Sequence, residues 1–121
     1  MRSITFQLMS IVLFVSGAVA ASPVPVVPVQ GTVTMVDLGA KSCIPCKMMM
    51  PVMEEVEKEY SEKAAIAFID VWENPEQSPK FNLRTIPTQI FYDKQGKEVF
   101  RHEGFYDKKS IAAMLDKLLT Q

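Results

Sequence analysis

The only two cysteines of this 121-residue chain, Cys43 and Cys46, stand where a strand pattern gives way to a helix pattern. Residues Thr32–Leu38 are β-branched and almost entirely apolar, which is typical of a strand covered on both faces. In the helix predicted from Cys43 to Glu62, the apolar residues at helical spacing are Met49, Val52, Met53, Val56 and Tyr60. The pattern therefore places Cys43 at the start of a helix and Cys46 one turn inside it.

The rest of the chain continues the alternation of strands and helices. The predicted elements are a buried strand over Ala64–Val71, an irregular or short helical stretch over Pro75–Leu83, a strand over Thr88–Tyr92, a hairpin turn at Asp93-Lys94-Gln95-Gly96, a strand over Glu98–His102, and a last helix capped by Asp107 or Ser110. This order predicts a central mixed sheet of about four strands flanked by helices. We therefore expect an α/β fold.

Length and composition exclude several kinds of protein. A chain of 121 residues is enough for one domain, and a formal charge of −1 gives no electrostatic reason to expect a nucleic-acid partner. Two cysteines cannot make a disulfide-stapled scaffold, and with a single histidine they cannot close a four-ligand zinc site without carboxylates or a second chain. We expect a compact monomer without a cofactor or a metal, in which the two cysteines are either incidental or central to the function.

The first 20 residues have the pattern of a secretory signal peptide. Arg2 precedes an apolar stretch at Leu8–Val15, and Ala18-Val19-Ala20 supplies the small residues that signal peptidase requires, so we expect cleavage directly after this tripeptide. The alternative is an uncleaved membrane anchor, although the apolar part is short and interrupted by polar residues for a spanning helix. Both interpretations predict export to the periplasm or another extracytoplasmic compartment.

A proline-rich stretch, residues 21–30, lies between the signal segment and the domain. It holds three prolines, which remove amide donors and favour extended conformations. We predict a tether or an edge segment here, at most an added edge strand. The domain itself is expected at residues 31–121.

The Cys43-Ile44-Pro45-Cys46 motif suits redox chemistry at this position. Unpaired amides and the dipole at a helix N-terminus favour an anion, so the thiolate form of Cys43 is stabilised. Cys46, one turn later, is close enough to attack a mixed disulfide formed by Cys43. Pro45 is tolerated because first-turn positions need no amide donor, and Lys47 adds a positive charge.

Three alternatives to redox chemistry stay open on the residues alone. A purely structural disulfide would close a very small loop and stabilise the fold little, because the entropic gain grows with loop length. A Cu(I) site is the second, with soft donors at Met48, Met49, Met50 and Met53. Methionines at helical spacing are more often core residues, and we expect only Met50 on the charged face of the helix. The third alternative is a pair of incidental thiols.

Beyond the motif, the chain resembles the thioredoxin family in residues that occur in the family's order from Val33 to Leu119. The matching residues are Asp37, Cys43-Ile44-Pro45-Cys46-Lys47, Pro51 within the helix, Asn74-Pro75, Phe81-Asn82-Leu83-Arg84-Thr85-Ile86-Pro87-Thr88 and Gly104. The resemblance implies a thioredoxin-like fold and a redox-active Cys43–Cys46 disulfide. Cys43 would be the nucleophile and Cys46 the resolving thiol.

The same resemblance implies roles for residues around the cysteines. Asp37 would be the buried carboxylate that assists proton transfer at Cys46. Ile86-Pro87 would be a cis peptide bond facing the cysteines, and the backbone of Ile86 would bind an extended substrate segment. The implied substrate-binding residues are Ile44, Pro45, Thr85, Ile86 and Pro87.

Three positions depart from the family pattern. Ser42 stands where a tryptophan is expected, Gly39 where an aromatic residue is expected, and Ile44 where the motif usually has glycine. The stretch before the first predicted strand is too short for the first strand and helix of a full thioredoxin, so we expect a version of the fold trimmed at the N-terminus. We also expect Trp72 to cap a strand end and His102 to be a surface or packing residue.

Together these observations predict an exported thiol–disulfide oxidoreductase acting on protein disulfides or dithiols. We favour the reducing direction, because Pro-Cys-Lys and Asp37 resemble the reducing branch of the family. Members of that branch receive electrons from a membrane donor and pass them to apocytochromes or misoxidised proteins. The alternatives are a dithiol oxidase or isomerase of exported proteins, a Cu(I)-binding protein of this fold, and an adaptor that only binds peptides.

Overall fold

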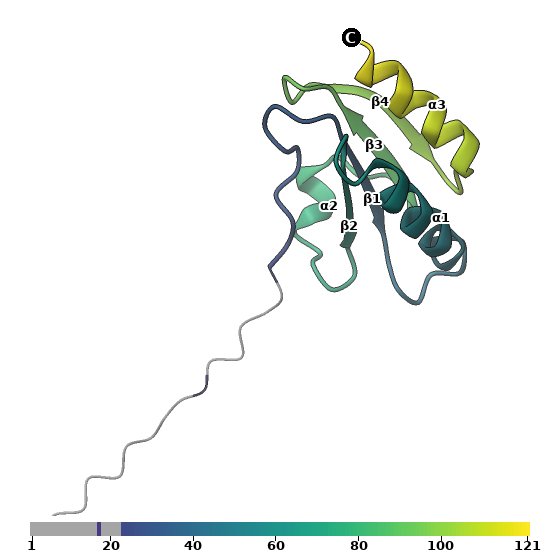
Figure 1. Ribbon diagram of the computed structural model, residues 1–121. Helices are drawn as coiled ribbons and strands as arrows, with labels where there is room; N and C mark the ends of the chain where they lie inside the picture. The colour runs from purple at the N-terminus through teal and green to yellow at the C-terminus, as the bar shows by residue number, and fades with distance from the viewer. Residues whose placement is uncertain (1–16, 18–22) are drawn as a thin grey trace, which may run out of the picture.

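A computed structural model describes residue 17 and residues 23–121 of the chain (Figure 1). The signal segment predicted for residues 1–20 lies outside the described residues, apart from Gly17. The elements in chain order are β1 (Thr34–Gly39), α1 (Ile44–Tyr60), β2 (Ala65–Asp70), α2 (Gln77–Lys80), β3 (Thr88–Tyr92), β4 (Glu98–Glu103) and α3 (Lys108–Leu119). Within the described residues, no helix is both long enough and apolar enough to cross a membrane.

The strands form one four-stranded mixed sheet in the order β2-β1-β3-β4. β1 and β2 are parallel and are connected through α1, whereas β3 runs antiparallel to both β1 and β4. Figure 1 shows α1 and α3 over one face of this sheet and α2 on the other. The structure confirms the predicted α/β fold with a mixed sheet flanked by helices.

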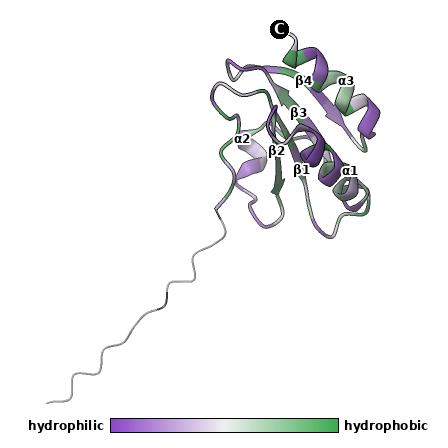
Figure 2. Ribbon diagram, in the orientation of Figure 1, coloured by the Kyte–Doolittle hydropathy of each residue, from purple (hydrophilic) through white to green (hydrophobic). Residues whose placement is uncertain are grey.

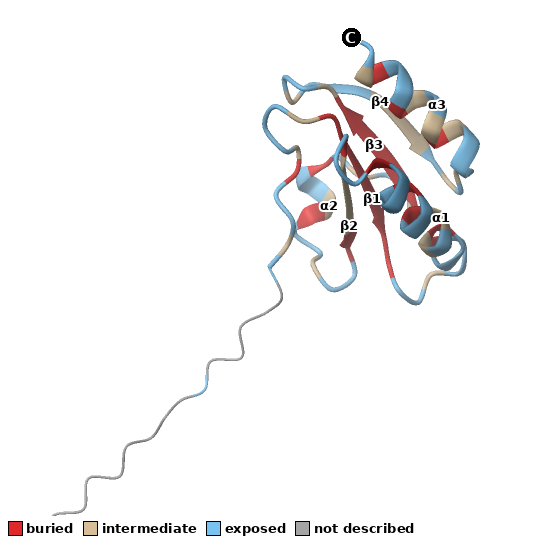
Figure 3. Cartoon of the chain, in the orientation of Figure 1, coloured by how far each residue is buried: buried red, intermediate tan, exposed pale blue. Residues whose placement is uncertain are grey.

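The alternation of side chains along β1 divides the core into two layers. Met35 packs with residues of α1 and α3, whereas Val36 and Leu38 pack on the opposite face of the sheet. Figure 3 shows the buried residues on β1, on β3 and on the inner sides of the helices, whereas β2 is mostly intermediate and β4 is intermediate or exposed. Figure 2 shows hydrophobic residues gathered on the strands and hydrophilic ones along the outer sides of α1 and α3. The sheet is therefore buried from both sides at its centre.

The proline-rich segment packs over the core layer on the face of the sheet opposite α1 and α3, and it does not join the sheet as a strand. Its described part, residues 23–30, forms no strand, and Val27 is buried among residues of β1, β2 and β3. The segment is attached where the amide of Val29 donates to Thr34 Oγ1 at 3.1 Å and the amide of Gly31 donates to the Lys94 carbonyl at 3.1 Å. Residues 23–30 therefore add no edge strand, and β2 is an outer strand of the sheet.

The ends of the helices have local causes. α1 ends at Tyr60 rather than at the predicted Glu62, because the Tyr60 carbonyl accepts hydrogen bonds from the amides of Lys63 and Ala64, both at 2.9 Å, which close the turn into β2. α3 begins after Asp107, whose Oδ1 accepts from the Ser110 amide at 2.9 Å. Of the two predicted caps, Asp107 is therefore the one that the helix uses.

Candidate active site

Cys43 and Cys46 form a disulfide where β1 is followed by α1. Cys43 is the N-cap residue of α1, Cys46 lies in its first turn, and their Cα atoms are 5.1 Å apart. Cys43 is partly exposed, whereas Cys46 is only 1% exposed. Cys43 is therefore the sulfur of the pair that a protein substrate can reach.

The start of α1 favours a negative charge on Cys43. The helix has no side-chain cap and no acidic residue in its first turn, and Lys47 follows directly after the motif. First-turn amides have no acceptor within the helix, and together with the helix dipole they stabilise an anion at the N-cap. Pro45 occupies a first-turn position where its missing amide proton costs no helical hydrogen bond.

Gly39, the last residue of β1, lies directly against Cys46. A Cβ atom on Gly39 would stand 3.3 Å from the Cβ and Sγ atoms of Cys46 and 3.3 Å from a ring carbon of Phe68. Phe68 lies on β2 and pairs with Asp37 of β1. These contacts are tight, so any side chain at position 39 would require Cys46 or the Phe68 ring to shift by a few tenths of an ångström. The sequence analysis missed Phe68, since pairing between strands is not visible along the chain.

Asp37 lies two residues before Gly39 and so on the same face of β1, against which Cys46 packs. The side chain of Asp37 is 0% exposed, and its Oδ1 accepts a hydrogen bond from Gln89 Nε2 at 2.9 Å. Its Oδ2 is buried without a hydrogen-bond partner among residues 23–121. Burial raises the pKa of this carboxyl to about 6, and the bond from Gln89 acts in the opposite direction. A carboxyl in this state can take up and return a proton near neutral pH.

The Ile86-Pro87 peptide bond is cis, as the resemblance implied. Thr88 pairs with Leu38 near the end of β1, so Pro87 lies next to that strand end, where Gly39 lies against Cys46. The Pro87 carbonyl accepts from the Gly104 amide at 2.7 Å, whereas neither backbone polar group of Ile86 is hydrogen-bonded within residues 23–121. Ile86 therefore keeps a donor and an acceptor available for an extended segment of a partner.

Comparison with known proteins agrees with this site. The model of the family described as Thioredoxin matches residues 26–117. Proteins named thioredoxin from Staphylococcus haemolyticus and Staphylococcus aureus are 44% and 43% identical to the chain over 91 residues, which cover 75% of this chain and 86% of each relative. The chain belongs to the thioredoxin family.

Solved structures of the family share its fold. The crystal structure of chloroplastic thioredoxin z has a TM-score of 0.69 and 26% identity, and the match covers 76% of this chain and 82% of that chain. The thioredoxin of Fasciola hepatica has a TM-score of 0.65 and 31% identity over 74% of this chain and 83% of its own. The Cys43–Cys46 pair is thus the redox-active disulfide of a thioredoxin-type thiol–disulfide oxidoreductase. A structural disulfide and incidental thiols are thereby excluded.

The family's substrate-binding positions are largely exposed in this chain. Ile44 is 74% exposed, and Pro45 and Thr85 are exposed as well. Pro87 is buried and Ile86 only partly so. Two other apolar side chains near the motif are exposed. Met48 lies in the second turn of α1, and Trp72 follows β2 at the end of the sheet where β1 is followed by α1. Trp72 was expected to cap a strand end. Its side chain is 60% exposed, so it adds to the apolar surface instead of packing over the strand end.

The methionines of α1 are divided between the core and the surface. Met49 and Met53 lie in the core, and Met49 Sδ accepts from the amide of Tyr106 at 3.3 Å. The expectation that only Met50 faces outward was wrong, because Met48 is 54% exposed whereas Met50 is partly buried. Across residue 17 and residues 23–121, no three histidine, cysteine, aspartate or glutamate side chains come together in a way that could hold a metal ion.

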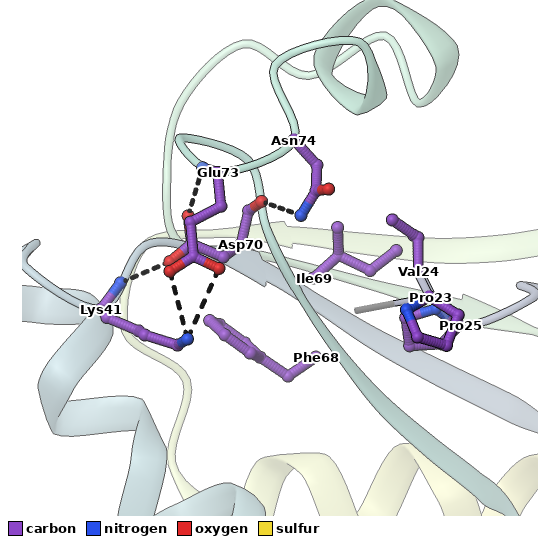
Figure 4. A pocket seen from close by; sticks show the side chains of 9 residues that line it. All are labelled: Pro23, Val24, Pro25, Lys41, Phe68, Ile69, Asp70, Glu73 and Asn74. Atoms are coloured by element: carbon purple, nitrogen blue, oxygen red, sulfur yellow. Dashed lines mark hydrogen bonds and ion pairs between the residues drawn. The ribbon is translucent and has the colours of Figure 1, made fainter. Parts of the chain in front are cut away.

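A second carboxylate, that of Asp70 at the end of β2, joins the loops next to the disulfide. Asp70 Oδ2 accepts from the Lys41 amide at 3.0 Å, and Oδ1 accepts from the amides of Trp72 and Glu73 at 2.9 Å each. Although burial acts to raise it, the pKa of Asp70 is lowered by these backbone bonds. Figure 4 shows the bonds to Lys41 and Glu73 beside a cavity of about 280 Å³ between β2 and the proline-rich segment. The sequence analysis missed Asp70, for which the available signal is an aspartate at the end of a buried strand.

Proposed function

We propose that this protein reduces disulfides of exported proteins with electrons from a membrane donor. The observation that carries the proposal is Asp37, a buried carboxyl whose pKa burial raises to about 6, on the face of β1 against which Cys46 packs. A base at this place helps Cys46 to become a thiolate. The Cys46 thiolate is the group that releases a client in reduced form.

The reaction is a sequence of two thiol–disulfide exchanges. The Cys43 thiolate attacks one sulfur of the client disulfide, and the other client sulfur leaves as a thiolate that takes up a proton. Cys46 then gives its proton to Asp37, and the Cys46 thiolate attacks Cys43 in the mixed disulfide. The Cys43–Cys46 disulfide forms, and the client leaves as a dithiol that has gained two electrons. The protein returns to its dithiol form only with an external reductant, which is the role proposed for the membrane donor.

Export to the envelope is supported by the first 20 residues, which follow the order of a signal peptide. An oxidising compartment needs a dedicated reductant for those proteins whose cysteines must stay free, such as apocytochromes or misoxidised envelope proteins. The exposed apolar side chains of Ile44, Met48 and Trp72 suit extended or unfolded protein segments as clients. The free backbone groups of Ile86 would pair with such a segment.

The reduction potential of the Cys43–Cys46 couple distinguishes a reductant from an oxidant. We expect a value near the roughly −270 mV of thioredoxin, far from the roughly −120 mV of strongly oxidising dithiol proteins. The measurement is equilibration with glutathione buffers of known ratio, followed by alkylation and mass analysis of the two redox forms. A potential close to the oxidising value would contradict the reducing direction and support a dithiol oxidase.

The site of signal cleavage is a second expected result. We expect the mature protein to begin at Ala21, with the first 20 residues removed. Intact-mass spectrometry of the protein recovered from the envelope fraction measures this directly. An intact Met1 in the membrane fraction would show an anchored protein, and an intact Met1 in the cytosol would contradict export.

A further inference from the structure

Three polar side chains form a row across the sheet, on the face covered by α1 and α3. Asp37 of β1 pairs with Gln89 of β3, which pairs with His102 of β4. Gln89 Nε2 donates to Asp37 Oδ1 at 2.9 Å, and Gln89 Oε1 lies 3.1 Å from His102 Nδ1. Asp37 and Gln89 are 0% exposed, whereas His102 is partly exposed. The row therefore connects a buried carboxylate to the protein surface.

Hydrogen-bond chemistry orients each member of the row. A carboxylate only accepts, so the amide nitrogen of Gln89 faces Asp37 and its oxygen faces His102. Because an amide oxygen also only accepts, His102 Nδ1 carries a proton in both the neutral and the charged imidazole. His102 Nδ1 therefore donates to Gln89 Oε1.

Packing holds His102 in this position. Its ring stacks on the ring of Tyr106, with centroids 4.0 Å apart and an interplanar angle of 13°. Tyr106 is attached in turn to Met49 of α1 through its backbone amide. The orientation of Gln89 therefore depends on a side chain that is itself fixed by the core.

Other charged groups are engaged away from the row. The neighbours of His102 on β4, Arg101 and Glu103, point to the opposite face of the sheet by strand alternation. Arg101 pairs with Glu98, and Glu103 pairs with Arg84. From β2, Asp37 faces Phe68, and from α1 the nearby group is Cys46. Within residues 23–121, no further ionisable side chain bonds to Asp37, Gln89 or His102.

We propose that Gln89 and His102 are positioning residues that select Asp37 Oδ2 as the proton acceptor for Cys46. This inference rests on the proposed role of Asp37 as the base. Gln89 occupies Oδ1, and Oδ2 is left buried without a partner in the described part of the chain. The proton passes from Cys46 Sγ to Oδ2 as the Cys46 thiolate displaces the client thiolate from Cys43. Neither Gln89 nor His102 takes part in the bonds that form or break.

The row also sets how readily Asp37 ionises. Burial raises the pKa of Asp37 to about 6, and the hydrogen bond from Gln89 lowers it by favouring the charged form. Loss of that donor should raise the pKa of Asp37 further, so that a smaller fraction of the carboxyl is ionised at pH 7. A side chain that only filled space would leave this equilibrium unchanged.

The test is a carbon-13 NMR titration of the Asp37 carboxyl in the protein with its Cys43–Cys46 disulfide intact. Gln89→Met keeps the length of the side chain and removes the donor, and it should raise the Asp37 midpoint by about one pH unit. His102→Phe retains a ring for stacking on Tyr106 but removes the Nδ1 donor, and it should shift the midpoint in the same direction by less. His102→Asn, whose amide nitrogen can replace Nδ1, should restore the original midpoint.

A kinetic measurement connects the row to Cys46. Reduced protein is mixed with dithionitrobenzoate, and the release of the second coloured thiolate reports the attack of Cys46 on Cys43. We expect the pH profile of this second release to move upward with the Asp37 midpoint in Gln89→Met and His102→Phe.

Two results would overturn the inference. One is an Asp37 midpoint that stays in place in both variants. The other is a midpoint that moves while the release profile does not. Asp37→Asn, measured in the same assay, tests the proposed base separately. A slower second release in that variant shows that Asp37 takes part in the mechanism even if Gln89 and His102 have no effect on it.

Discussion

Cys46→Ser is expected to convert a transient encounter with a client into a stable covalent complex. Cys43 still attacks the client disulfide, but the variant lacks the Cys46 sulfur that resolves the mixed disulfide. In the unchanged protein the Cα atoms of Cys43 and Cys46 are only 5.1 Å apart. A thiol held this close to its target acts at an effective concentration of about 10⁵ M or more, so loss of the Cys46 thiol should abolish measurable turnover. Non-reducing electrophoresis and mass spectrometry of cells that express the variant should show the trapped partners, which we expect to be exported proteins.

Cys43→Ser is the matched control for this experiment. Cys46 is only 1% exposed and lies inside the first turn of α1, so it cannot reach a client sulfur and should trap nothing. If Cys46→Ser captured no exported protein, the proposed reductase function would fail. Complexes formed equally by both variants would contradict the assignment of Cys43 as the nucleophile.

Asp37→Asn is expected to stabilise the folded protein at pH 8 and to change its stability little at pH 4. Burial raises the pKa of this carboxyl from 3.8 to about 6, so the folded state holds its proton to a higher pH than the unfolded chain does. The free energy of unfolding therefore falls as the pH rises through this window, and the penalty is complete above it. A shift of about two pH units corresponds to about 3 kcal/mol. Asparagine keeps an acceptor for Gln89 and has no charge to bury.

Urea unfolding of the oxidised protein at the two pH values measures this gain. Glu54→Gln is the control, since it makes the same kind of substitution at an exposed position of α1. A gain of equal size at pH 4 and pH 8 would contradict ionisation of Asp37 as the cause. Asp37→Asn should also release mixed disulfides more slowly. This loss of rate would separate the functional role of the Asp37 carboxyl from its cost to stability.

The redox site was predictable from the sequence because its main parts are local. Cys43 and Cys46 share one helical turn, and the strand before them and the helix after them each have a clear period. The segment around Ile86-Pro87 was found through a motif that is also contiguous in the chain. Periodicity thus predicted the α/β order, the position of the motif predicted the nucleophile, and the resemblance to the thioredoxin family implied the cis peptide bond.

Only the tertiary structure decided which residues from distant parts of the chain contact one another around the redox motif. Asp37 and Gln89 are 52 residues apart in the chain, and strand pairing makes them hydrogen-bonded neighbours. The tertiary structure also brings Cys46 and the Phe68 ring close to Gly39, and it brings the amides of two different loops to the carboxylate of Asp70.

The sequence by itself therefore determined which residues carry the chemistry, since reactive side chains and the periodicity of strands and helices can be identified directly in the sequence. The tertiary structure decided the surroundings that adjust this chemistry. It buried Asp37 with one oxygen that has no hydrogen-bond partner among residues 23–121, and it gave His102, expected only to pack or face solvent, a hydrogen bond to Gln89. The physical reason is that burial and hydrogen bonding depend on neighbours brought together by the pairing of distant strands, and no local pattern records which neighbours those are.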